Sequence, residues 1–275
     1  MDLVFSDIHA DMDGLETILK IVLSSEFEEK YGKISRIINL GDLLERGTSP
    51  KEVLQKIQGL SKTYPVISVM GNHDESVLYK KSISGSSFAS ARAHELLSEQ
   101  DLEFFHQNKD GTFGEQQIID AKNKLLCVHG GPLDPKKITK EGGDPWLYQK
   151  TWQRLSEENN EFYSYYGYHY RASSAFEEGK TKLENFIILC GHQHIEAAMQ
   201  QNKNEITNIW PSQPVTEKIE SFVMQKREFE IDKTSNYLFR VGLGGPQGHH
   251  SGGFAKPHFG VIQHDPKKVI LFGLE

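Results

Sequence analysis

Cysteine is scarce in this sequence, which argues against a fold stabilised by disulfides. Only two of the 275 residues are cysteine, Cys127 and Cys190. Each follows a short apolar run, as a buried free thiol in a strand does. A chain of this length can bury a sizeable core without covalent cross-links. We therefore expect two buried and unpaired thiols.

An excess of positive charge is also missing. The chain has 38 acidic and 31 basic residues, which gives a formal net charge of −7. Proteins that bind nucleic acid or anionic membranes over a broad surface usually present a basic face. The composition therefore argues against bulk nucleic-acid binding and against membrane binding, while a local basic pocket for phosphate remains compatible with it.

Long apolar runs are absent as well. No run approaches the ~20 residues that a membrane-spanning helix needs. The first residues do not show a basic segment followed by an apolar one, the pattern of a secretory signal. The expectation from these features is a soluble, cytoplasmic protein.

What the sequence does contain is an alternation of short apolar runs and helical patterns. The runs predict strands at residues 3–5, 34–40, 66–69, 125–128 and 186–189. The helical patterns cover residues 14–23, 50–60 and 89–107, the last with an interruption near Ser98. Strands that alternate with helices indicate an α/β fold with a mainly parallel sheet covered on both faces. We expect one domain that spans residues 1–275.

Two parts of the chain depart from this alternation. After His194 the apolar runs are of the β type and predict largely antiparallel strands at residues 197–199, 221–223, 237–241, 259–262 and 269–272. Residues 131–183 form an aromatic-rich, cap-like insertion. This insertion is either a small helical cap that packs on the domain or a lid that shapes substrate access, because aromatic side chains serve both roles. Within it, His169, Tyr170 and Arg171 could contact substrate.

Side chains that can bind metal ions follow five of the apolar runs. The motifs are Ser6-Asp7-Ile8-His9, Gly41-Asp42, Gly71-Asn72-His73-Asp74, His129-Gly130-Gly131 and Gly191-His192-Gln193-His194. Ligands of open α/β sheets bind outside the carboxyl ends of the strands, so these runs should deliver their side chains to one edge of the sheet. Each motif alone is weak evidence for a functional site. Five of them in order, most beside a glycine that permits a tight turn, indicate a site.

The candidate ligands mix nitrogen and oxygen donors and include no convincing thiolate. They are Asp7, His9, Asp42, Asn72, His129, His192 and His194. Such a set suits Mn, Fe or Zn better than Mg or Ca, which prefer all-oxygen shells. The set is too large for one ion and about right for two ions that share a bridging carboxylate. Two ions ~3.5–4 Å apart can hold a phosphoryl group and generate hydroxide at neutral pH. We therefore expect two divalent or trivalent transition-metal ions, with Mn favoured over Fe and Zn.

The order of these motifs, from residue 7 to residue 194, resembles that of the calcineurin-like metallophosphoesterase superfamily. The resemblance implies a four-layer α/β/β/α sandwich of two mixed sheets flanked by helices. It also implies that His73 contacts no metal and works beside the leaving group. The two implied ligand sets are Asp7, His9, Asp42 and His194 for one metal, and Asp42, Asn72, His129 and His192 for the other.

A finer similarity concerns residues 41–47, Gly-Asp-Leu-Leu-Glu-Arg-Gly. They are similar to the Gly-Asp-x-Val-Asp-Arg-Gly block of the phosphoprotein phosphatase branch, which includes serine/threonine phosphatases and bacterial diadenosine tetraphosphatases. This resemblance implies that Arg46 grips the substrate phosphate and that Glu45 orients the catalytic His73.

The chain departs from that branch at several positions. Glu45 stands where the branch has Asp, Asp74 where it usually has Glu, and Ala10 where a Gly usually follows the first His. The Gly-His-x-His ending is instead typical of smaller, phosphodiesterase-like members. Glycine-rich residues 242–253, with His249 and His250, lack the Lys-Ser/Thr of a nucleotide P-loop. They form either a plain flexible loop or, as in those smaller members, a loop beside the metals.

The expected activity is hydrolysis of a phosphate ester by a metal-bridging hydroxide. Asp42 would bridge the metals, Arg46 would neutralise phosphate oxygens, and His73 would protonate the leaving oxygen. The favoured substrates are phosphomonoesters or phosphoproteins, and the alternative is a phosphodiesterase or dinucleoside polyphosphate hydrolase. A remoter alternative is a non-catalytic scaffold, which predicts lost ligands or a lost His73, whereas all are present.

Overall fold

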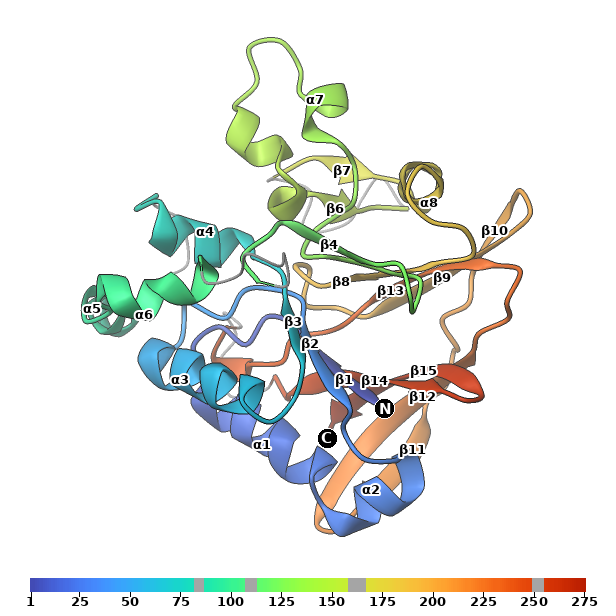
Figure 1. Cartoon of the computed structure of the whole chain (residues 1–275), viewed down its shortest axis with the longest axis horizontal. Coiled ribbons are helices and arrows are strands. Elements are labelled where there is room, and N and C mark those ends of the chain that lie inside the picture. Colours follow the sequence, from blue (N-terminus) through green and yellow to red (C-terminus); the bar gives the residue numbers. More distant parts are fainter. Residues whose placement is uncertain (82–86, 107–112, 158–166, 249–254) are drawn as a thin grey trace.

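The computed structural model of the chain describes residues 1–81, 87–106, 113–157, 167–248 and 255–275 (Figure 1). Two mixed β-sheets form its centre. The first has seven strands in the order β11-β12-β15-β14-β1-β2-β3, and the second has six in the order β10-β9-β13-β8-β5-β4. The strands of the first sheet are β1 Asp2–Phe5, β2 Arg36–Asn39, β3 Val66–Ser68, β11 Val215–Ile219, β12 Phe222–Glu230, β14 His258–His264 and β15 Lys267–Leu274. Those of the second are β4 Gln117–Asp120, β5 Leu125–Val128, β8 Ile187–Cys190, β9 Ala197–Asn202, β10 Glu205–Asn208 and β13 Asn236–Arg240.

The helices cover the outer faces of the two sheets. They are α1 Met12–Val22, α2 Ser25–Tyr31, α3 Pro50–Ser61, α4 Asn72–Leu78, α5 Phe88–Glu95, α6 Glu99–Leu102, α7 Pro135–Ile138 and α8 Ala172–Lys180. Short 3₁₀ turns are η1 Glu103–Phe105, η2 Pro145–Tyr148, η3 Lys150–Trp152 and η4 Pro246–Gly248, and a small parallel pair joins β6 Arg154–Leu155 to β7 His169–Tyr170. α1, α2 and α3 pack on the first sheet, and α8 packs on the second.

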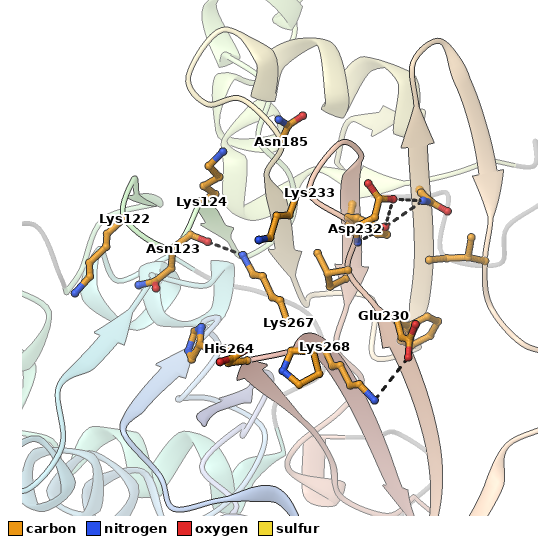
Figure 2. A pocket seen from close by; sticks show the side chains of 17 residues that line it. Lys122, Asn123, Lys124, Asn185, Glu230, Asp232, Lys233, His264, Lys267 and Lys268 are labelled. Atoms are coloured by element: carbon orange, nitrogen blue, oxygen red, sulfur yellow. Dashed lines mark hydrogen bonds and ion pairs between the residues drawn. The ribbon is translucent and has the colours of Figure 1, made fainter.

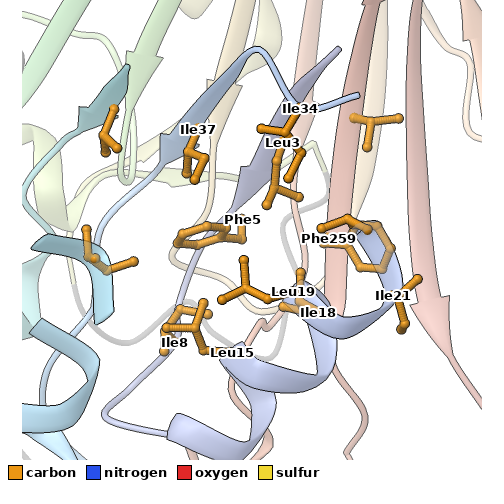
Figure 3. Packing of buried hydrophobic residues seen from close by; sticks show 14 of the residues in the cluster. Leu3, Phe5, Ile8, Leu15, Ile18, Leu19, Ile21, Ile34, Ile37 and Phe259 are labelled. Atoms are coloured by element: carbon orange, nitrogen blue, oxygen red, sulfur yellow. The ribbon is translucent and has the colours of Figure 1, made fainter. Parts of the chain in front are cut away.

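Alternation along the short strands explains why both faces of each sheet are buried. In β1, Leu3 and Phe5 join the cluster beneath α1, while Val4 points into the cluster between the sheets. Figure 3 shows Leu3 and Phe5 packed against Leu15 and Ile18 of α1. A strand with two covered faces reads as an apolar run rather than as an alternating one, as this one does.

The predicted four-layer sandwich is confirmed. One expectation drawn from the residues was wrong in part, because the five motif-bearing strands do not share one sheet. β1, β2 and β3 lie in the first sheet, and β5 and β8 lie in the second. Apolar runs show that strands exist but not which strands pair, so the sequence could not separate the two sheets.

Most of the predicted elements are present with shifts of one to three residues. The helix expected at residues 89–107 is divided into α5, α6 and η1, and Ser98 caps α6 by accepting a hydrogen bond from the Asp101 N–H. The late strands pair mainly antiparallel, although β13 lies parallel to β8. Cys127 and Cys190 are buried free thiols, as expected. Among the described residues, no helix has both the length and the apolar character that crossing a bilayer requires.

Several elements were not anticipated: α2, α4, β4, β10 and β11. α2 is short and largely charged, and Ser24 caps it by accepting a hydrogen bond from Phe27 N. α4 begins inside the Gly71-Asn72-His73 motif itself. β4, β10 and β11 are four or five residues long and largely polar or half-exposed. Short polar segments carry little periodicity, and their pairing is decided by their neighbours.

Candidate metal centre

The five motifs lie at one end of the sandwich, where the carboxyl ends of strands from both sheets meet. Asp7 and Asp42 follow β1 and β2, and His129 and His192 follow β5 and β8. Within the first sheet, Asp7 N donates a 2.9 Å hydrogen bond to Gly41 O. Between the sheets, His192 N donates a 3.0 Å hydrogen bond to Asp7 Oδ2. The parallel pairing of the strands therefore explains why residues distant in sequence share this end.

One group of candidate ligands consists of Asp7, His9 and His194, whose ligand atoms all lie within 4.8 Å of one another. Asp7 Oδ1 lies 3.8 Å from His9 Nε2 and 3.4 Å from His194 Nε2. The two imidazole nitrogens are 3.1 Å apart. Three donor atoms thus converge on one point.

A second group consists of Asp42, His129 and His192, and a third consists of His9, Asp42 and His73. Asp42 Oδ2 lies 3.1 Å from His129 Nε2 and 3.8 Å from His9 Nε2, so this carboxylate stands between the two groups. Asn72 Oδ1 lies 3.2 Å from His129 Nε2 and adds an amide oxygen to the second group. The structure brings all seven predicted ligands together and places Asp42 where a shared ligand belongs.

The imidazoles are oriented by hydrogen bonds through their other nitrogen. His129 Nδ1 donates to Leu40 O at 2.7 Å, and His9 Nδ1 donates to Leu44 O at 3.3 Å. A carbonyl oxygen can only accept, so these contacts fix the protons on Nδ1 and turn Nε2 toward the site. Burial holds the pKa of His9 well below its usual range, with Arg46 next in effect, so His9 is neutral at pH 7. Burial does the same to the pKa of His192.

Two buried polar atoms show that this donor set fits cations. Within the described part of the chain, Asp7 Oδ1 and His192 Nε2 have no hydrogen-bond partner. A buried acceptor without a partner costs ~1–3 kcal/mol, and more when it is charged. The two atoms belong to different ligand groups. A cation in each group would satisfy both, and the mixed nitrogen and oxygen donors suit a transition metal.

The backbone is strained at the same place. Thirteen described non-glycine residues have positive φ, and eight of them lie in the motifs or within four residues after one. These eight are Asp7, His9, Ala10, Asp42, Glu45, Arg46, His192 and His194. Left-handed conformations cost of order 1–3 kcal/mol each and persist only where surrounding contacts enforce them. Such strain is found at functional sites, and here it aims the ligands inward.

Hydrogen bonds to Asp74 hold much of this strained backbone in place. Its Oδ2 accepts from Asp42 N and Gly71 N, both at 2.9 Å, and its Oδ1 accepts from Leu44 N at 3.0 Å. Burial and then the charge of Asp42 raise the pKa of Asp74 to about 7. A Cβ at Gly71 would lie 2.0 Å from Asp42 Oδ1, so glycine is required there. Asp74 therefore holds together the loop that carries Asp42 and the loop that carries Gly71. In the sequence it stands out only as a departure from the phosphoprotein phosphatase branch.

The predicted catalytic residues His73 and Arg46 are in contact. Arg46 Nη2 donates to His73 Nε2 at 3.1 Å, and His73 Nδ1 has no hydrogen-bond partner among the described residues. Burial lowers the pKa of His73 to about 3 although Asp42 opposes the shift. His73 is therefore neutral at pH 7 before substrate binds. The orientation of His73 by the side chain of Glu45 stays a prediction.

Two residues of the site were missed by sequence reasoning. Arg154 lies in β6, and burial followed by repulsion from Arg46 lowers its pKa to about 10. A second guanidinium is thus held near the first. His94 lies in α5, where its Nδ1 donates to Ser90 O and its Nε2 accepts from Glu45 N, both at 2.7 Å. Neither residue belongs to a motif at a strand end, so no local pattern identified them.

The aromatic-rich segment contacts the site through its described residues. The ring of Trp152 lies 6.0 Å from that of His192, centroid to centroid. Tyr170 is buried and its hydroxyl donates to Gly130 O at 2.8 Å, which gives it a structural role next to His129. His169 Nδ1 lies 2.7 Å from Ser156 Oγ. Phe162, Tyr163, Tyr165 and Tyr166 lie outside the described residues.

The first part of the glycine-rich segment lies against the metal ligands. Gly244 N donates to Ser6 O at 2.9 Å, and Gly245 N donates to Asp7 O at 3.0 Å. Of the two alternatives for residues 242–253, these contacts favour a loop beside the candidate metal ligands. His249 and His250 lie outside the part of the chain that the structure describes.

Comparison with known proteins identifies the family. The sequence model of the calcineurin-like phosphoesterases matches residues 3–196, about two thirds of the chain and all five motifs. The chain belongs to this family. It is a phosphoesterase, a hydrolase that acts on phosphorylated substrates, as the resemblance implied.

Individual relatives are more distant. Uncharacterized protein MJ0912 of Methanocaldococcus jannaschii is 35% identical over 80 residues, which are 29% of this chain and 28% of the relative. The metallophosphoesterase of Sphaerobacter thermophilus shares the fold, with a TM-score of 0.60 and 18% identity over 100% of this chain and 87% of that chain. Hypothetical protein PH1004 of Pyrococcus horikoshii has a TM-score of 0.60 and 16% identity over 100% and 88%. These structures support the fold and leave the substrate open.

Proposed function

We propose that this phosphoesterase hydrolyses phosphate monoesters, of small molecules or of phosphoproteins, with two transition-metal ions. The observation that carries the proposal is the convergence of the candidate ligands around Asp42, where two buried atoms, Asp7 Oδ1 and His192 Nε2, lack a hydrogen-bond partner among the described residues. Asp7, His9, Asp42 and His194 would hold one ion. Asp42, Asn72, His129 and His192 would hold the other. When bound, the ions would supply the activated water nucleophile and neutralise phosphoryl oxygens.

The guanidiniums of Arg46 and Arg154 bind the substrate phosphate. Each presents a planar fork of donors that matches two phosphate oxygens. Repulsion between two half-buried guanidiniums is relieved by an anion placed between them, which is consistent with the lowered pKa of Arg154. A monoester dianion offers more charge to this pair than a diester monoanion. The arginine pair therefore favours monoesters over the alternative diester substrates.

His73 protonates the leaving oxygen. Because burial lowers its pKa to about 3, we expect His73 to be protonated only once substrate is bound. When Arg46 turns to the phosphate, His73 Nε2 loses the donor that now occupies it at 3.1 Å and becomes free to be protonated. The added negative charge raises the pKa of His73 at the same time. The side chain of Glu45, one methylene longer than the Asp of the phosphoprotein phosphatase branch, would stabilise the protonated form of His73.

The non-catalytic scaffold is disfavoured by the same geometry. All seven ligands converge, and His73 and Arg46 lie in contact beside them. A scaffold would have no need to keep strained backbone at these positions.

The test is an activity screen of the Mn-loaded enzyme against 4-nitrophenyl phosphate, bis(4-nitrophenyl) phosphate and diadenosine tetraphosphate. We expect kcat/KM for the monoester to exceed that for the diester by roughly 10–100-fold, because a charge-assisted hydrogen bond contributes ~1.5–3 kcal/mol. A preference for the diester or the tetraphosphate would refute the monoester assignment. If the protein binds metal but hydrolyses none of these esters, the non-catalytic scaffold would become the favoured hypothesis.

A further inference from the structure

A second site lies at the opposite end of the sandwich from the metal centre. There the two sheets leave a cleft with a volume of about 980 Å³ (Figure 2). Its walls are the turn between β4 and β5, the residue Asn185 before β8, the loop between β12 and β13, and the turn between β14 and β15. β5 and β8 begin beside this cleft and end in His129 and His192. The cleft is therefore separate from the catalytic site.

Positive charge gathers around this cleft. Lys122, Lys124, Lys233, Lys267 and Lys268 line it, in a protein whose formal net charge is −7. Lys268 is neutralised by Glu228 at 2.6 Å. The structure records no ion pair for the other four among the residues it describes, and Figure 2 shows them around the opening.

Among the described residues, the carboxylates that line the cleft form an ion pair with one cleft lysine alone, Lys268. Glu230 lies 3.8 Å from Lys268. Asp232 accepts hydrogen bonds from the hydroxyls of Thr234 and Ser235, both at 2.7 Å, and from Tyr237 at 2.8 Å. Asp265 is exposed on its turn. Asp232 is thus hydrogen-bonded to hydroxyl groups, and the described residues show no ion pair between it and a cleft lysine.

Lys267 brings a half-buried positive charge next to the turn that carries Lys122 and Lys124. It is half-buried, and its Nζ donates to Asn123 O at 2.8 Å. Burial lowers the pKa of Lys267, and the nearby ammonium of Lys124 lowers it further. An anion bound between this turn and Lys267 would be attracted by both ammonium groups.

The floor of the cleft is apolar. Ile209, Phe229 and Ile231 line it and pack on the core between the sheets. A concave apolar surface with a few charged groups at its rim is the usual form of a small-molecule site. The floor suits a planar or apolar group, and the rim suits an anionic one.

We propose that this cleft binds a small polyanion with a planar or apolar portion, the chemistry of a nucleoside polyphosphate. This site is independent of the proposed catalytic function and takes its ligand without metal ions.

Binding of ATP and of inorganic tripolyphosphate to the full-length, chelator-treated protein tests the proposal by calorimetry. The variant Lys124→Gln/Lys267→Gln removes two cleft charges. The matched control, Lys33→Gln/Lys62→Gln, removes two charges from exposed positions at the ends of α2 and α3. Arg46→Ala reports on any binding at the catalytic site. Melting temperatures verify that all variants are folded.

We expect wild type, the control and Arg46→Ala to bind ATP alike, and the cleft variant to bind it at least about tenfold more weakly. ATP should bind more tightly than tripolyphosphate because the floor contributes. Three results would overturn the site: no ATP binding by wild type at millimolar concentration, equal losses in the cleft and control variants, or loss of binding in Arg46→Ala. Equal affinities for ATP and tripolyphosphate would overturn the role of the floor.

Discussion

The two ends of the sandwich differ in how their ionisable side chains are buried and paired. At the carboxyl ends of β1, β2, β5 and β8, carboxylates and imidazoles are buried and held by backbone hydrogen bonds. At the amino ends of β5 and β8, the cleft lysines are exposed or half-buried, and of the five only Lys268 has an ion-pair partner among the described residues. One end is built to surround cations and the other to receive an anion.

The difference also separates rigid sites from adaptable ones. Strain at the metal centre is enforced by Asp74, His94 and the pairing of the strands. Flexible lysine side chains on turns carry no such enforcement. We therefore expect metal binding to stabilise the fold strongly, and changes in the cleft to leave catalysis untouched.

The largest expected effect comes from removing the metals. Chelation should lower turnover of 4-nitrophenyl phosphate by at least about a thousandfold, because the ions contribute several kcal/mol to the transition state. It should also lower the Tm, since ions bind the folded state alone. ATP binding in the cleft should survive. Loss of both phosphate-ester turnover and ATP binding on chelation would show that the two ends do not function separately.

The next effect concerns the general acid. His73→Asn should slow hydrolysis of alkyl phosphates by ~10²–10⁴-fold and that of nitrophenyl phosphate far less, because nitrophenolate leaves without a proton. Both metals should remain bound. Glu45→Gln should show the same pattern more mildly. Equal slowing of the two substrate types, or loss of a metal, would contradict the assignment.

A smaller effect is expected at His94, which holds the loop that carries Arg46. His94→Phe removes the acceptor of the Glu45 N–H, and we expect phosphate inhibition to weaken roughly tenfold with metal content unchanged. His94→Gln keeps a side-chain acceptor and should restore part of the affinity. Arg46→Ala gives the upper limit of the effect. Similar behaviour of the Phe and Gln variants would show that His94 does not act through this hydrogen bond.

The smallest effect is expected from the cleft. Lys124→Gln/Lys267→Gln should leave kcat/KM for monoesters within about twofold of wild type, because exposed charges this far away are screened by salt. A steady-state assay at physiological ionic strength checks this. A larger change would mean that the two ends communicate.

The same contrast explains how much could be predicted from the sequence. Asp7, Asp42, His129 and the other ligands follow apolar runs, so strand position and chemistry coincide in a short motif. His94 and Arg154 reach the site from α5 and β6, and their role depends on tertiary contacts alone. The division into two sheets depends on pairing between distant strands. The lysine cleft joins four separate turns, none of which carries a motif.

The most direct test of the account is the number of metal ions per chain. Elemental analysis of the pure protein after saturation with Mn should give two ions for wild type. Asp42→Ala, which removes the carboxylate between the two ligand groups, should disturb both ions, whereas His9→Ala should mainly affect one. A stoichiometry of one or less for wild type under saturating metal would contradict the two-metal centre.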